Sequence, residues 1–163
     1  RRRVMLHKPT GLVSATTDAG HQTVIDLIDE PWAQELHLAG RLDRFTTGLV
    51  ILTNDGEFSE SLTEPGKKVG KRYLVETDAE ITEEMVQAFQ EGMWFAKERV
   101  TSAPAIVKVL GKKNCRLTIY EGKHHQVKRM FSRFEVKVVR LHREAIGEYE
   151  LGDLQLGKWR LIE

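Results

Sequence analysis

The 163-residue chain lacks most features of secreted and membrane proteins. Its single cysteine, Cys115, excludes an internal disulfide. No apolar stretch approaches the ~18 residues of a membrane span or resembles the core of a signal peptide. Repeats, low-complexity tracts, proline- or serine-rich linkers and coiled-coil heptads are also missing. We therefore expect a cytoplasmic monomer without membrane contact.

The net charge of +1 conceals an uneven distribution along the chain. Residues 76–98 contain seven acids and one base, whereas residues 123–143 contain seven bases and one acid. A second basic cluster, residues 67–72, is followed by the aromatic Tyr73. Separate acidic and basic regions indicate a polyanion-binding face opposite a solvated one, and the neighbouring aromatic favours a nucleic acid as partner.

Short apolar runs with strand character alternate irregularly with segments of helical period. The expected strands are residues 4–6, 49–53, 73–76, 105–110, 115–120 and 136–141. Helical segments are expected at residues 23–28, 57–62 and 82–92, the last with Thr82 as its N-cap. Without a regular βαβ alternation, this order favours an α+β fold with a mixed sheet.

Two further patterns predict buried side chains. In residues 127–134 the apolar residues follow the i, i+3, i+4, i+7 spacing of one helix face, and they are Val127, Met130, Phe131 and Phe134. That face should belong to the core, while the cations of the same helix lie on its other sides. Cys115 lies in an alternating strand-like stretch, which predicts a buried thiol.

Asp43 is the carboxylate that first suggests chemistry. It lies in the segment Gly40-Arg41-Leu42-Asp43-Arg44-Phe45-Thr46-Thr47-Gly48, between two arginines and two bracketing glycines. Neighbouring cations favour the ionised carboxylate, which can act as a nucleophile or electrostatic partner but not as a proton donor. The segment alone also fits an aspartate in a turn whose side chain hydrogen-bonds its own backbone. That is the commoner role of a loop aspartate.

Other sequence motifs do not carry a site. Gly66-Lys67-Lys68-Val69-Gly70-Lys71-Arg72 has three residues between its glycines, where a phosphate-binding loop needs four, and it lacks the Ser or Thr that holds magnesium. His124 and His125 with Cys115 lack the spacing of metal ligands, so no metal is expected. No nucleophile-elbow pattern supports a Ser–His–Asp triad.

Four ordered motifs resemble those of pseudouridine synthases that act on bacterial ribosomal RNA, in the RsuA-like branch. His7-Lys8-Pro9-Thr10-Gly11 resembles the opening Asn-Lys-Pro-x-Gly motif, and Gly40-Arg41-Leu42-Asp43 with Thr47-Gly48-Leu49 resembles the catalytic loop. Lys71-Arg72-Tyr73-Leu74-Val75 is similar to the tyrosine motif. The stretch from Glu121 to Phe131 is similar to the third motif, and Leu141-His142-Arg143 follows it.

The resemblance implies one catalytic domain over residues 1–163 that can divide into two lobes around an active-site cleft. Its fold would be the synthase core, an α+β fold in which helices flank a mixed, mainly antiparallel central sheet. RsuA relatives usually begin with a small S4-type RNA-binding domain, which is not visible in this sequence. Either the domain has been removed or the chain belongs to a subgroup without it.

The resemblance also implies a mechanism without metal or cofactor. Asp43 would be the nucleophile that attacks the target uridine while its glycosidic bond breaks, after which the base rotates and reattaches through carbon. Tyr73 would stack on the uracil and help to remove the C5 proton. Lys128 would pair with Asp43, with Arg129 as the fallback partner. Residues expected to bind the substrate are Arg41, Arg44, Lys71, Arg72, Lys123, His125, Gln126, Val127 and Arg129.

Two departures from the family pattern accompany the match. His7 replaces the usual asparagine, and Lys128 stands where many synthases carry arginine, which keeps the charge but loses the bidentate fork.

The third motif favours small-subunit (16S) ribosomal RNA as the target. The alternative target is large-subunit (23S) ribosomal RNA, as for an enzyme of the RluE or RluF type. The partner would be ribosomal RNA or a partly assembled subunit. A non-catalytic RNA-binding module for ribosome assembly is the alternative from another class.

Overall fold

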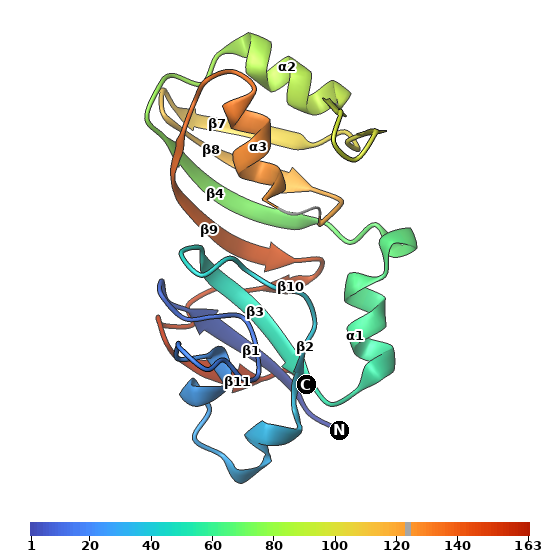
Figure 1. Cartoon of the computed structure of the whole chain (residues 1–163), viewed down its shortest axis with the longest axis vertical. Coiled ribbons are helices and arrows are strands. Elements are labelled where there is room, and N and C mark those ends of the chain that lie inside the picture. Colours follow the sequence, from blue (N-terminus) through green and yellow to red (C-terminus); the bar gives the residue numbers. More distant parts are fainter. Residues whose placement is uncertain (123–124) are drawn as a thin grey trace. The chain divides into compact units, whose positions relative to one another are not determined.

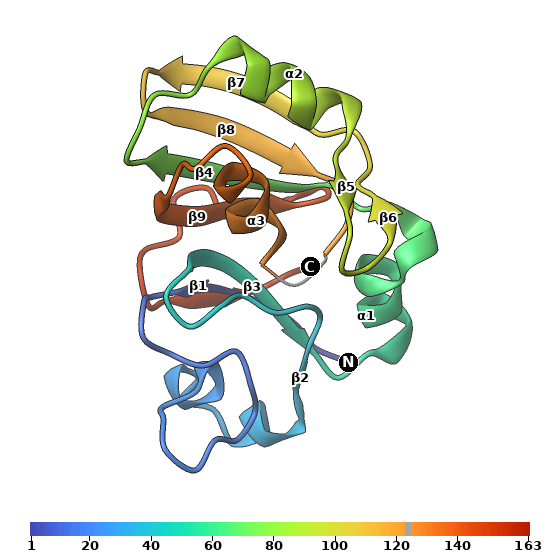
Figure 2. The same cartoon turned by 45° about the horizontal axis from the view of Figure 1, so that its top comes forward.

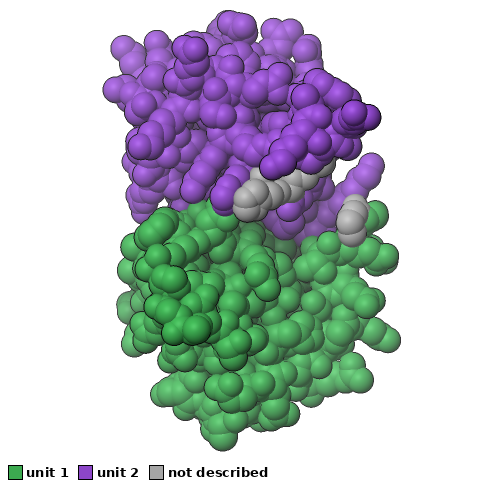
Figure 3. All heavy atoms as spheres, viewed as in Figure 1, with its two compact units in different colours: residues 1–67, 143–163 green, residues 68–142 purple. Residues whose placement is uncertain are grey.

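The computed structural model describes residues 1–122 and 125–163. The chain divides into two compact units, coloured separately in Figure 3. Unit 1 comprises Arg1–Lys67 and Arg143–Glu163, and unit 2 comprises Lys68–His142. None of the helices in the described ranges has the length and apolar character that a membrane crossing requires.

Unit 1 is built on an antiparallel sheet with the strand order β11-β1-β3-β9 (Figure 1). Its strands are β1 (Arg3–Lys8), β2 (His37–Leu38), β3 (Thr47–Thr53), β10 (Tyr149–Glu150), β11 (Trp159–Leu161) and the end of β9 (Val138–Ile146). Helix α1 (Gly56–Thr63) flanks β3, and three short 3₁₀ segments are Val24–Leu27, Pro31–Glu35 and Pro65–Lys67. In β3 the run Leu49, Val50, Ile51 and Leu52 is completely buried, as a strand covered on both faces requires.

Unit 2 contains a second antiparallel arrangement in the order β9-β4-β8-β7. Its strands are β4 (Lys71–Thr77), β7 (Ile106–Gly111), β8 (Asn114–Ile119), the first part of β9, and the separate pair β5 (Trp94–Phe95) and β6 (Val100–Thr101). Helices α2 (Glu83–Glu91) and α3 (Gln126–Ser132) lie on the same face of these strands (Figures 1 and 2). Phe89 of α2 and Phe131 of α3 meet with ring centroids 4.9 Å apart in the core between them.

The sequence-based expectations for the main elements are confirmed. All six expected strands coincide with observed ones, although the last begins at Val138 and continues to Ile146. Thr82 caps α2 by accepting a hydrogen bond from the Met85 amide at 3.3 Å, and Gly92 ends the helix with a φ of 99°. The Cys115 thiol is buried in β8, which raises its pKa to about 11.

Two expectations differ from the structure in detail. The segment expected as a helix at residues 23–28 forms only a 3₁₀ segment, Val24–Leu27, because the chain turns extended at Ile28, shortly before Pro31. The two- and three-residue strands β2, β5, β6, β10 and β11 were not expected. Such short strands depend on the partner strand more than on their own composition.

Asp55 fixes the start of α1 and connects it to β1. Its carboxylate accepts from the Phe58 amide at 3.3 Å and forms ion pairs with Arg1 at 3.1 Å and Arg3 at 3.2 Å. Burial alone would raise the pKa of Asp55, but the bond from Phe58 and the two arginines outweigh that effect and lower it. The charged carboxylate therefore stabilises this end of unit 1 at neutral pH.

Gly48 allows β3 and β9 to approach within unit 1. Its φ is +115°, and a Cβ atom built on it would lie 2.2 Å from the Arg143 carbonyl oxygen. An L-residue would therefore be strained by its backbone and would also overlap the neighbouring strand. The contact matters because Gly48 is the last residue of the Asp43 segment.

Gly48→Ala should destabilise the protein by more than Gly11→Ala does. Gly11 has a similar φ of +94° but open space around the Cβ position, so its substitution should cost about 1–3 kcal/mol of backbone strain. At Gly48 the overlap with Arg143 adds to that strain. Urea unfolding of both variants measures the difference, and equal losses would show that the close approach contributes nothing.

Candidate active site around Asp43

Asp43 begins a tight turn in unit 1. The Thr46 amide donates to the Asp43 carbonyl oxygen at 3.0 Å, which places Arg44 and Phe45 at the two central positions of the turn. On the other side, the amide of the buried Leu42 donates to the Ser14 hydroxyl oxygen at 3.1 Å. The side chain of Asp43 is half-buried. The expected turn is therefore present, and it does not preclude a chemical role because the carboxylate is partly accessible.

Lys8 is completely buried beneath this turn, at the end of β1. Its Nζ donates to the carbonyl oxygens of Arg44 and Thr46, each at 2.8 Å, and of Pro9 at 3.1 Å. Desolvation lowers the pKa of Lys8 from 10.5 to about 8, while the negative charge of Asp43 acts in the opposite direction. The Lys8 ammonium thus holds the carbonyls of the turn by hydrogen bonds, and the negative charge of Asp43 stabilises its protonated form.

Arg143 holds the same segment from strand β9. Its buried guanidinium donates from Nε to the Leu49 carbonyl at 2.9 Å and from Nη1 to the Arg41 carbonyl at 3.5 Å. These two carbonyls lie on either side of Asp43 in the sequence. Together with Lys8, Arg143 therefore holds the backbone before and after the carboxylate.

The two arginines next to Asp43 are exposed. Arg44 and Gly11 are joined twice, because the Gly11 amide donates to the Arg44 carbonyl at 2.8 Å and Arg44 Nε donates to the Gly11 carbonyl at 3.0 Å. The guanidinium of Arg44 lies 5.0 Å from the centroid of the Phe45 ring. Arg41 contributes its carbonyl to the contact with Arg143.

The expected residues of the tyrosine motif lie on β4 in unit 2. Tyr73 is buried and pairs in register with Leu117 of β8, while the preceding Lys71 and Arg72 are half-buried. The Lys71 Nζ lies close to Gly122, 2.7 Å from where a Cβ atom of that glycine would be. The basic start of β4 therefore lies near the beginning of the third motif.

Helix α3 carries the remaining expected residues of unit 2. Gln126 and Val127 are buried, and Lys128 is half-buried. Gln126 donates to Glu121 Oε2 at 2.9 Å, and the same oxygen accepts from the Ala103 amide at 2.9 Å. His125 precedes the helix in the left-handed region, with a φ of 51°. Lys123 lies outside the described residues.

Arg129 is bound to an acidic side chain of its own unit. Its guanidinium makes two hydrogen bonds to Glu98, one of them from Nη2 at 2.9 Å, and lies 4.7 Å from the centroid of the Phe95 ring. The bonds to Glu98 raise the pKa of Arg129.

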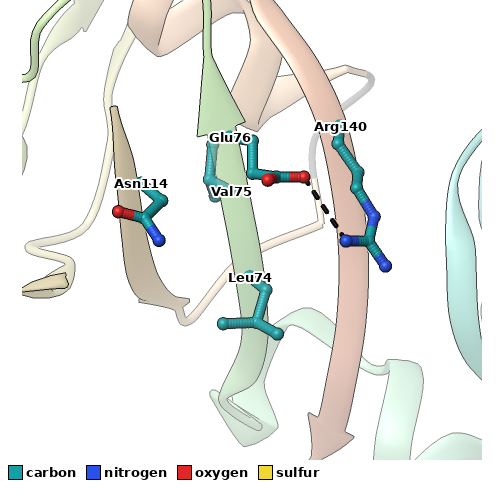
Figure 4. A pocket seen from close by; sticks show the side chains of 5 residues that line it. All are labelled: Leu74, Val75, Glu76, Asn114 and Arg140. Atoms are coloured by element: carbon teal, nitrogen blue, oxygen red, sulfur yellow. Dashed lines mark hydrogen bonds and ion pairs between the residues drawn. The ribbon is translucent and has the colours of Figure 1, made fainter. Parts of the chain in front are cut away.

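A pocket on unit 2 is lined by Leu74, Val75, Glu76, Asn114 and Arg140, of which Arg140 and Glu76 form an ion pair (Figure 4). None of the expected site residues lines this pocket.

Comparisons with known proteins decide the family. A family model described as RNA pseudouridylate synthase matches residues 2–133. The ribosomal small subunit pseudouridine synthase A of Pseudomonas aeruginosa is 51% identical over 161 residues, which cover 98% of this chain and 70% of that protein. The enzyme of the same name from Escherichia coli strain K12 is 44% identical over 98% of this chain and 69% of its own length. A crystal structure of a pseudouridylate synthase superposes with a TM-score of 0.94 at 40% identity, covering 99% of this chain and 70% of that one.

The chain belongs to the RNA pseudouridylate synthase family. The family predicted from the four motifs is therefore confirmed, together with the enzyme class and the α+β core with a mainly antiparallel sheet. The synthase isomerises uridine to pseudouridine. Within residues 1–122 and 125–163, no group of three or more His, Cys, Asp or Glu side chains is arranged to hold a metal ion.

Lys8 and Arg143 were not predicted as partners of the Asp43 segment. Both lie within motifs that support the resemblance. Arg143 was counted with the basic region 123–143 that was expected to bind a polyanion, but its side chain is buried. A usable signal existed for Lys8, which follows Val4 and Leu6 at the two-residue period of one buried strand face. The pairing of Asp43 with Lys128 stays a prediction.

Lys8→Met should remove a specific pH dependence of stability. Between the folded pKa of about 8 and the ordinary 10.5, the unfolded chain binds more protons at Lys8 than the folded synthase does. The free energy of unfolding of the wild type should therefore rise, relative to that of the variant, as the pH increases through this range. The loss of the three hydrogen bonds in the variant affects the comparison at every pH. Urea unfolding at about pH 7, 9 and 10.5 measures the trend.

Lys158→Met is the matched control, because Lys158 is an exposed lysine of the same unit. Its difference from the wild type should stay constant over the same pH range. A constant difference for Lys8→Met as well would contradict the assignment of a lowered pKa to Lys8.

Proposed function

We propose that the synthase isomerises a specific uridine in the RNA of the small ribosomal subunit. The observation that carries this proposal is the 51% identity, over nearly the whole chain, to a relative named as a small-subunit enzyme. The third motif favours the same subunit from the sequence alone. The substrate would be ribosomal RNA, either free or in a partly assembled subunit, and the enzyme would act on it in the cytoplasm.

The isomerisation requires a nucleophile that stays in place while the base moves. The N1–C1′ bond breaks, the C5–C1′ bond forms, a proton leaves C5, and N1 gains a proton, so no oxidant or other co-reactant is consumed. We assign the nucleophile to Asp43. Its support is the half-buried carboxylate on a turn whose flanking carbonyls are held by Lys8 and Arg143. A fixed backbone keeps the carboxylate in position for attack at little entropic cost.

Tyr73 and Lys128 are proposed to act with Asp43. Tyr73 would stack on the uracil and help to remove the C5 proton, and Lys128 would balance the charge of the nucleophile. Arg129, the fallback for this role, makes two hydrogen bonds to Glu98 of its own unit. Val127, buried at the start of α3, would form part of the apolar pocket wall.

The substrate-binding cations expected from the sequence are proposed to hold the RNA backbone. They are Arg41, Arg44, Lys71, Arg72 and Lys123, together with His125. Contacts to phosphates supply affinity with little sequence discrimination, so selection of the uridine would depend on RNA shape and on unstacked bases. Gln126 differs from this group, since its buried amide donates to Glu121 and so connects the start of α3 to that carboxylate.

Asp43→Asn should abolish pseudouridine formation while RNA binding stays close to wild type. The amide has the size of the carboxylate but is not a nucleophile. Small- and large-subunit ribosomal RNA from a deletion strain complemented with each version would be mapped for pseudouridine. Modification restored only by the wild type, and only in the small-subunit RNA, is the expected result.

Asp153→Asn is the matched control, because the Asp153 side chain is 96% exposed in the same unit. It should restore the modification fully. If the Asn variant at residue 43 also restores it, Asp43 is not the nucleophile. If the wild type restores modification only in the large-subunit RNA, that RNA is the target in place of the small-subunit RNA. If the wild type restores modification in neither RNA, the result favours a non-catalytic RNA-binding module.

Tyr73→Phe and Tyr73→Leu should separate stacking from proton removal. Phenylalanine keeps the aromatic face, so uridine binding should persist while the chemical step slows by about 100-fold or more, the usual contribution of a general base. Leucine should weaken binding as well, because stacking contributes roughly 1–3 kcal/mol per base. Single-turnover rates over a range of enzyme concentrations measure both effects. A phenylalanine variant with the wild-type rate would exclude the hydroxyl from proton transfer.

A further inference from the structure

Phe45 is an exposed aromatic side chain two residues after Asp43. It is 68% exposed, more than any other large apolar residue in the part of the chain that the structure describes. It occupies a central position of the turn that begins at Asp43, where small and polar residues are usual because they suit turn backbones. Neither burial nor turn preference accounts for a phenylalanine at this position.

The backbone that carries Phe45 is held on both sides. Lys8 Nζ donates to the carbonyls of the preceding Arg44 and the following Thr46, each at 2.8 Å. Arg44 is also joined to Gly11 by two hydrogen bonds, and its guanidinium lies 5.0 Å from the Phe45 ring centroid. An aromatic ring with a cation beside it is therefore presented to solvent from an ordered turn, close to the reacting carboxylate.

A ring in this environment suits a nucleobase. Every base has a π-face that stacks on aromatic side chains, and a neighbouring arginine adds attraction to the RNA and to the ring. A uridine taken out of the stack leaves the adjacent base without a stacking neighbour. An apolar protein partner would fit less well, because the guanidinium of the exposed Arg44 places a positive charge beside the ring.

We propose that Phe45, supported by Arg44, is a stacking site for an unpaired RNA base next to the target uridine. This inference rests on the proposed function and adds a binding residue to it. The site would tolerate different bases, since stacking reads the π-face and not the hydrogen-bonding edge. Phe45 contributes to substrate binding and positioning and takes no part in bond making or breaking.

The test compares Phe45→Ala, Phe45→Leu and Phe45→Trp with the wild type. Small- and large-subunit ribosomal RNA transcripts serve as probes, and both the dissociation constant and the single-turnover rate of pseudouridine formation are measured. Loss of stacking should weaken binding by about 5- to 150-fold in the alanine and leucine variants, whereas tryptophan should stay within about twofold of the wild type. The slope of affinity against salt concentration should not change, because no phosphate contact is lost.

Leu156→Ala is the matched control, as Leu156 is 59% exposed in the same unit but has no cation-supported ring. It should bind and react as the wild type does, and all variants should unfold at the wild-type urea midpoint. Wild-type binding by Phe45→Ala, or full rescue by leucine, would overturn the stacking site.

The two proposals fail in different ways. If the wild type binds a transcript tightly but forms no pseudouridine, the proposed function fails, and the binding data still decide whether Phe45 stacks on RNA. If the wild type forms pseudouridine and Phe45→Ala matches it in rate and affinity, the proposed function stands and the stacking site is wrong. A wild type that binds neither transcript overturns both.

Discussion

The burial of the Lys8 ammonium under the Asp43 turn is the interaction on which the site in unit 1 depends. A charged amine excluded from water must find acceptors, and Lys8 finds them in the carbonyls of Pro9, Arg44 and Thr46. Because two of these carbonyls belong to the turn, satisfying the buried charge also determines the turn conformation. The cost of desolvation is visible in the lowered pKa of Lys8, and the charge of Asp43 offsets part of it.

The same principle applies to the second cation of unit 1. Arg143 is buried in β9 and directs its donors to the carbonyls of Leu49 and Arg41, and this is possible because Gly48 has no side chain between the two strands. A glycine, a lysine and an arginine that are distant in the sequence thus hold one short segment. The half-buried Asp43 carboxylate and the exposed Phe45 ring are then placed by a backbone with little freedom.

Unit 2 positions its polar groups in a different way, through carboxylates. Glu121 receives hydrogen bonds from Gln126 and from the Ala103 amide, and Glu98 binds Arg129. These contacts connect the start of α3 to Glu121 and hold Arg129 of the same helix, while the apolar face with Phe131 packs on Phe89 of α2.

Periodicity and local motifs predicted the elements that carry their own signal. The four-residue apolar run of β3 and the capped helix α2 were predicted, and so was the apolar face of α3, because burial patterns of this kind are written in consecutive residues. The short strand β11 was not predicted, since its residues Trp159–Leu161 become a strand through pairing with β1. The 3₁₀ segment Val24–Leu27 was expected to be a longer helix, and no local pattern showed that the chain would become extended at Ile28.

The sequence motifs were sufficient to identify the family and to single out Asp43 as a candidate, because each motif is contiguous and the four occur in the family's order. Which cations contact the Asp43 segment depends on the tertiary structure. Arg41 and Arg44 are adjacent to Asp43 in the sequence, yet the buried donors that hold its turn come from Lys8 and Arg143. The tertiary structure also decided that Phe45 is exposed. Burial and distant hydrogen-bond partners depend on which strands pair with each other, and the paired strands are far apart in the sequence. A local pattern of residues does not specify that pairing.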